Sequence, residues 1–74
     1  MGEHLEEYLD ILEEDPKFRN FVKTDPHQAM AEARLSHDEK EILLSGDPDR
    51  VARESGKTLS PAVREVITEA AKHL

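Results

Sequence analysis

The sequence contains no cysteine and no tryptophan. The absence of cysteine excludes disulfide scaffolds, cysteine-based zinc sites and thiol nucleophiles. Aromatic residues are scarce, since the chain offers only Tyr8, Phe18 and Phe21. Nucleic-acid binding needs aromatic stacking surfaces and a basic stripe on the protein, and this chain has neither. We therefore expect no nucleic-acid partner.

Long apolar runs are missing as well. No stretch approaches the roughly 18 consecutive residues that a membrane span needs, and residues 1–10 lack the basic region and apolar core of a secretory signal peptide. We expect no membrane partner and a cytoplasmic location. The chain has 74 residues, which suit one domain and leave too little chain to enclose a deep catalytic pocket.

Basic residues are absent from the first 15 positions, whereas seven acidic residues lie there. The charge of this segment equals the net charge of the whole chain, −7, because residues 16–74 hold ten acidic and ten basic residues. The negative charge is therefore confined to one acidic segment on a neutral body.

Apolar residues in the same segment recur at helical spacing, since Leu5, Tyr8, Leu9 and Leu12 follow the i, i+3, i+4, i+7 pattern. This pattern predicts an amphipathic helix over about residues 3–14, with the acidic side chains opposite its apolar face. The residues that we consider candidates for binding a partner are the acids Glu6, Glu7, Asp10 and Glu13 and the neighbouring apolar edge, Tyr8 and Ile11.

Two interpretations of the acidic face remain open. The simpler one is a solvated face that keeps a small protein soluble. The alternative is a binding face, and the positions of Glu13 and Glu14 favour it. Both lie near the expected helix C-terminus, where an exposed negative charge opposes the helix dipole by about 0.3–1 kcal/mol.

Three Asp-Pro pairs mark further helix starts, at Asp15-Pro16, Asp25-Pro26 and Asp47-Pro48. Aspartate is a strong N-cap because its carboxylate accepts a hydrogen bond from a backbone N–H of the first turn. Proline suits the first helical position, where its missing N–H costs nothing. We predict helices over about 16–23 and 26–33, and a short one that begins at 48 and ends at Gly56.

Two serines give the remaining helix starts. Ser36 and Glu39 form the sequence signature of a capping box, and Gly46 suits the left-handed C′ position that closes that helix. Ser60-Pro61 begins a last helix over about 60–74. We therefore predict one all-α domain, residues 1–74, of five or six short helices.

Candidate catalytic and metal-binding residues do not converge in the sequence. His37 and Glu41 lie at i, i+4 and His4 and Glu7 at i, i+3, but a zinc or di-iron site needs three or four ligands. No hydroxyl residue lies in a nucleophile elbow, and Ser36 and Ser60 are needed as caps. We expect no catalytic residue, no metal ligand and no cofactor.

The middle of the chain resembles a known family. Phe21 is followed by Asp25-Pro26 and Ala29, and then by the string LSHDEKEILLSGD over residues 35–47. Over about residues 8–55 this pattern is similar to the LigA-like domain, the small helical subunit of protocatechuate 4,5-dioxygenase and its stand-alone relatives. Position 34 is Arg where that family favours Gly.

The resemblance implies an all-helical module that packs against a larger catalytic subunit, which carries the iron. Our expectation is a non-catalytic accessory domain with a protein partner. The domain also resembles the recognition part of precursors of backbone N-methylated peptides, so a leader domain that docks on a peptide-modifying enzyme is the alternative. A small metal-binding or enzymatic helical protein is the second alternative.

Overall fold

A computed structural model of the chain describes residues 3–72 and is helical, with no strand in this range. The helices are α1 (Glu3–Glu14), α2 (Pro16–Thr24), α3 (Pro26–Glu32), α4 (His37–Leu44), α5 (Pro48–Ser55) and α6 (Pro61–Ala71). The all-α prediction is confirmed, and the boundaries of α2 and α3 lie within one residue of those expected. Residues 73 and 74, which the sequence analysis placed in the last helix, lie outside the described residues.

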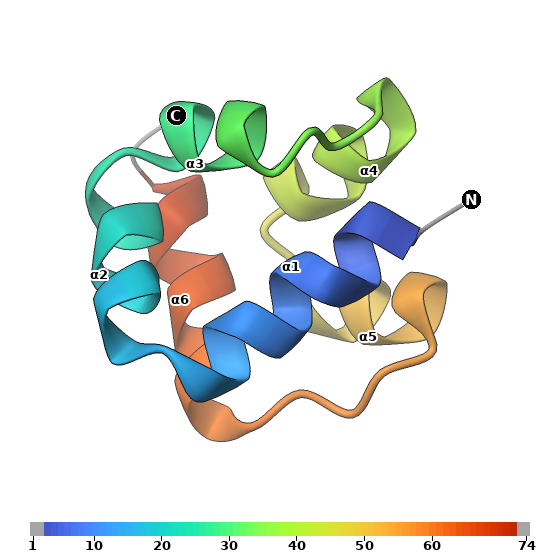
Figure 1. Cartoon of the computed structure of the whole chain (residues 1–74). Helices are drawn as coiled ribbons and strands as arrows, with labels where there is room; N and C mark the ends of the chain where they lie inside the picture. Colours follow the sequence, from blue (N-terminus) through green and yellow to red (C-terminus); the bar gives the residue numbers. More distant parts are fainter. Residues whose placement is uncertain (1–2, 73–74) are drawn as a thin grey trace.

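The helices surround α6, which packs against α1, α2, α4 and α5. Figure 1 shows α1 crossing the bundle in front of α5 and α6, with α2 and α3 at one side and α4 at the other. The molecule measures 26 × 23 × 20 Å. None of the helices among residues 3–72 has the length and hydropathy that a membrane crossing requires.

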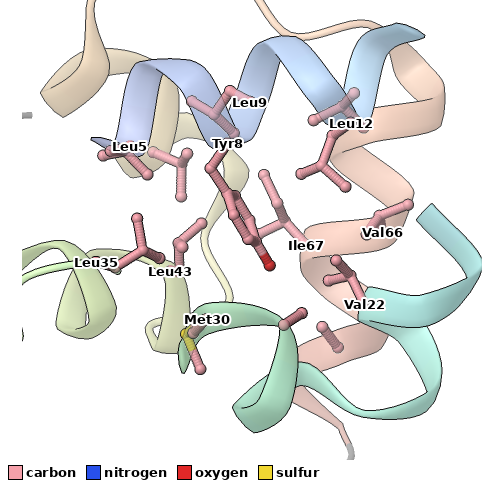
Figure 2. Close-up of a cluster of buried hydrophobic side chains, with 14 of the residues drawn as sticks. Leu5, Tyr8, Leu9, Leu12, Val22, Met30, Leu35, Leu43, Val66 and Ile67 are labelled. Carbon is pink, nitrogen blue, oxygen red and sulfur yellow. The ribbon is translucent and has the colours of Figure 1, made fainter. Parts of the chain in front are cut away.

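The first and last helices supply most of the core. Helix α1 buries Leu5, Leu9 and Leu12, and α6 buries Val63, Val66, Ile67 and Ala70; several of these side chains meet in Figure 2. Full burial of a side chain of the size of leucine or valine contributes about 1.5–3 kcal/mol. Residues 61–71 are therefore part of the fold rather than a detachable tail.

Two helices end at glycines in the left-handed conformation. The φ angle is +69° at Gly46, after α4, and +71° at Gly56, after α5, which confirms the expected roles of both residues. Gly46 has a second role, because a Cβ atom placed there would lie 2.7 Å from the Cβ of Ala71. The backbone of this turn thus packs directly on α6, whereas a Cβ at Gly56 would meet open space.

The two glycines give a matched test of this packing. Gly56→Ala should lower the free energy of unfolding by about 1–2 kcal/mol, because alanine avoids positive φ. Gly46→Ala should lower it by a further 1–3 kcal/mol or so through overlap with Ala71. Urea denaturation measures both losses, and Ala71→Gly should recover part of the second one. Equal losses for the two variants would contradict direct packing of α6 on the Gly46 turn.

Candidate functional site

The expected caps occupy helix N-termini, and each side chain accepts a hydrogen bond from the first turn. The donor-to-acceptor distances are 2.9 Å for Lys17 N to Asp15, 3.2 Å for Gln28 N to Asp25, 3.2 Å for Glu39 N to Ser36, 3.0 Å for Asp49 N to Asp47 and 3.3 Å for Val63 N to Ser60. These predictions are confirmed. The side chains stabilise local structure, because they satisfy backbone N–H groups that lack a partner within the helix.

Glu39 does more than complete its capping box. Its carboxylate accepts a hydrogen bond from Ser36 N at 2.8 Å and another from Leu5 N, also at 2.8 Å, in the first turn of α1. The residue is 5% exposed, so one buried carboxylate binds backbone N–H groups at the N-terminal ends of both α1 and α4. Burial raises the pKa of Glu39, but the hydrogen bonds from Ser36 and Leu5 outweigh that effect and leave the pKa below its ordinary value.

The lowered pKa of Glu39 determines the direction in which its contribution to the free energy of unfolding changes with pH. A carboxyl group with a depressed folded-state pKa stabilises the fold above its ordinary value of 4.5, and this stability is lost as the pH falls through the folded-state pKa. Glu39→Gln should therefore lower the free energy of unfolding near neutral pH, by at least about 1.5 kcal/mol for the loss of a charged hydrogen bond. Its stability should also depend less on pH in the acidic range. Denaturation series from acidic to neutral pH measure both effects.

Glu41, two positions further along α4 and exposed, provides the control. Glu41→Gln should leave the stability and its pH dependence close to those of the parent protein. The same acid-range slope for the parent and for Glu39→Gln would contradict the role of Glu39 as a buried anchor.

Two of the acidic residues expected to bind a partner are engaged within the fold. Asp10 accepts a hydrogen bond from Lys57 Nζ at 2.8 Å, and this bond raises the pKa of Lys57, to which the charge of Glu6 also contributes. The carboxylate of Glu13 accepts hydrogen bonds from the hydroxyl of Ser60 and from Ser60 N, the latter at 3.3 Å. Asp10 and Glu13 therefore hold the segment that leads into α6.

Glu13 is not badly placed for stability, contrary to the expectation from its position near the end of α1. The structure puts its carboxylate at the N-terminus of α6, where the helix dipole favours a negative charge. The C-terminus of α1 receives a positive charge from the next helix, since Arg19 Nη1 donates to the carbonyl of Leu12 at 2.7 Å and to that of Glu13 at 3.2 Å. Sequence analysis missed Arg19, because a contact between neighbouring helices has no local signature.

Tyr8 is a core residue rather than an exposed edge, although it is also among the residues that line a groove beside α1. The residue is 2% exposed, and its ring meets that of Phe18 edge to face at a centroid distance of 5.4 Å. Figure 2 shows the side chain running from α1 towards α3 and α6, where it borders an apolar cavity of 20 Å³. Helices α2, α3 and α6 pack over the side of α1 on which Tyr8 lies and bury it. The helical period alone did not decide whether this side was buried or exposed.

The burial of Tyr8 predicts how it titrates. Desolvation raises the pKa of Tyr8 well above its ordinary value of 10.0, so the folded state holds the proton longer than the unfolded state does. The stability that Tyr8 contributes is therefore complete below pH 10.0 or so and declines as the pH rises further. Tyr8→Phe should change stability by less than about 1 kcal/mol at neutral pH and should resist alkali better than the parent. Thermal unfolding at neutral and alkaline pH measures this, and equal alkaline losses would refute it.

Three of the four remaining acids of α1 form an outward stripe, and the fourth, Glu6, is exposed as well but lies about 60° to one side of it. Glu3, Glu7 and Glu14, which we call the outer stripe, lie within about 40° of one another at 100° per residue, opposite Leu5. All are exposed, and none forms an ion pair with another residue in the range 3–72. Ile11 lies beside this stripe and is 44% exposed.

A groove of 290 Å³ borders the outer stripe, between α1 and the turn that follows α3. On the α1 side it is lined by His4, Glu7, Tyr8 and Ile11, and on the other side by Glu32, Ala33 and Arg34. Three of these seven residues, Glu7, Tyr8 and Ile11, were expected from the sequence to bind a partner. The i, i+3, i+7 spacing of His4, Glu7 and Ile11 could have indicated a shared face, but residues 32–34 reach it only through the packing of α3 beside α1.

Arg34 has a backbone conformation that is unusual for its type. It is the one non-glycine residue among positions 3–72 with positive φ, at +58°. A non-glycine residue in this conformation costs about 1–2 kcal/mol. The side chain is exposed and forms no ion pair with the described part of the chain.

No group of three or more histidine and acidic side chains that could hold a metal ion is present among residues 3–72. The pair expected at i, i+4 does meet, since His37 Nε2 lies 3.6 Å from a Glu41 carboxylate oxygen on an exposed face of α4. Of the four histidines in the sequence, His73 lies outside the described residues. Neither a family model nor a curated protein matches the sequence, and no solved structure matches the fold.

Proposed function

We propose that this protein is a non-catalytic interaction module of the LigA-like accessory type, which docks on a larger enzyme through the outer face of α1. The observation that carries the proposal is the outer stripe of Glu3, Glu7 and Glu14. Its carboxylates have no ion-pair partner among residues 3–72, whereas Asp10 and Glu13 on the same helix are bound within the fold.

Glu3 lies in the first turn of α1, where the helix dipole favours a negative charge, but the other features of the stripe are unfavourable for the helix. Glu3 and Glu7 lie at i, i+4, where like charges destabilise a helix by about 0.2–0.5 kcal/mol. Glu14 lies at the C-terminal end of α1, where a negative charge opposes the dipole. A basic surface on a partner would relieve both effects and would be attracted to the stripe before contact.

The conformation of Arg34 is relevant to the LigA-like resemblance. At φ +58° the turn has a shape that glycine adopts readily, and glycine is the residue that the family favours there. The alternative function, a leader domain for a modified peptide, is supported less well. Residues 61–71 are packed in the core, with Val63 and Val66 fully buried, so they are not accessible as a substrate segment.

Charge reversal tests the proposal. The partner is first isolated by co-purification with the tagged chain from its native source and identified by mass spectrometry. Glu7→Lys combined with Glu14→Lys should lower the association rate at low salt by about tenfold or more. The difference should shrink above about 0.15 M salt, because exposed charges are then screened. Stopped-flow mixing with the purified partner measures the rates.

A second double variant controls for net charge. Glu41→Lys with Glu54→Lys makes the same change in net charge on exposed positions of α4 and α5 and should leave the association rate within about twofold of the parent. Circular dichroism should show that both double variants remain helical. If the two variants associate equally fast, the stripe serves only solubility and the proposed docking face is wrong.

A further inference from the structure

We propose that the groove between α1 and the turn after α3 seats an aliphatic side chain of the partner protein, flanked on that partner by one basic and one acidic residue. The inference rests on the proposed function, because Glu7 belongs both to the outer stripe and to the groove. The inference adds to that function the kinds of side chain that the binding segment of the partner carries.

The apolar part of the groove accounts for the aliphatic anchor. Ile11 is 44% exposed and lies on the α1 side, and Ala33 is half-buried on the other side. A volume of 290 Å³ is close to the lower end of the range for ligand pockets, about 300–1,000 Å³. It therefore suits one large side chain better than a cofactor, and covering Ile11 would remove exposed apolar area from water.

The charged part of the groove accounts for the flanking residues. Glu7 on α1 and Glu32 at the end of α3 line it from opposite sides, and both are exposed. They would attract a lysine or arginine of the partner. Arg34 lies on the α3 side and would pair with a carboxylate, so the groove has both signs of charge. Such a pattern selects a partner segment and fixes its direction more than it raises affinity.

Arg34 gives the sharpest test, because folding favours glycine at this position whereas the proposed binding uses the arginine side chain. Glycine at position 34 would remove the strain of a positive φ and would also remove the guanidinium group. We expect Arg34→Gly to raise the melting temperature while it weakens binding. A residue that served only the fold would not shift these two measurements in opposite directions.

The experiment uses the full chain, labelled with ¹⁵N, and synthetic peptides blocked at both ends. The probes are eight-residue peptides with one central leucine and a lysine and a glutamate on opposite sides, made in both orders and titrated to millimolar concentration. We expect one order to shift the amide signals of residues 7, 11, 32 and 33 in a saturable way. A peptide with serine in place of leucine should not.

Two exposed aliphatic residues provide matched variants. Ile11→Ser should raise the dissociation constant of the peptide by about tenfold or more, the loss expected for one buried aliphatic contact. Leu44→Ser removes the other large exposed apolar side chain among residues 3–72, which is 36% exposed and lies outside the groove, and should leave the dissociation constant unchanged. Arg34→Gly should weaken binding while the protein melts at a higher temperature.

Failure of this inference can be distinguished from failure of the proposed function. The inference is overturned if neither peptide order gives saturable shifts at the groove, or if Ile11→Ser and Leu44→Ser affect binding equally. The proposed function still stands in that case if reversal of Glu7 and Glu14 slows association with the isolated partner. If that reversal has no effect either, both proposals are wrong.

Discussion

The hydrogen bonds of the buried Glu39 carboxylate fix the relative position of two helices that lie far apart in the sequence. A helix leaves its first four N–H groups, counted from the N-cap, without partners inside the helix, and in a helix as short as α4, with eight residues, these groups are a large share of its donors. Glu39 satisfies Ser36 N, just before α4, and Leu5 N in α1 with one carboxylate. The start of α1 is thereby held against α4, and this determines which face of α1 points to solvent.

The same principle explains the distribution of acidic residues along α1. Glu13 satisfies the start of α6 through Ser60, and Asp10 holds Lys57 in the segment before it. Arg19 of α2 covers the carbonyl groups at the end of α1. A negatively charged helix is compatible with a stable small domain because several of its charges cap or anchor other parts of the chain. The carboxylates of Glu3, Glu7 and Glu14 have no such task among residues 3–72.

This division connects the fold to the proposed function. The anchored acids lie towards α5 and α6, and the outer stripe lies opposite the core, beside a groove to which α3 contributes Glu32 and Ala33. A partner would therefore meet a rigid helix whose orientation is fixed at both ends. Holding the helix in one orientation lowers the entropy lost on binding, which is consistent with the proposed docking function.

The sequence by itself determined the helices and their ends. Asp-Pro pairs, the Ser36–Glu39 capping box and the glycines at 46 and 56 are local signals, because a cap depends on residues within one turn of it. Helical periodicity also identified the core of α1 and α6. Part of the candidate site was predictable in this way, since Glu7, Tyr8 and Ile11, three of the seven residues that line the groove, follow from the period of α1.

The tertiary structure decided which side chains at the border of the apolar face of α1 are exposed to a partner. It buried Tyr8 beneath α2, α3 and α6 and left Ile11 exposed. It gave Glu39 and Glu13 partners more than thirty residues away, and it brought residues 32–34 beside α1. Periodicity specifies the direction in which a side chain leaves its own helix axis. It contains no information on whether another helix or solvent lies in that direction. That depends on the packing of helices against one another, which no local pattern records.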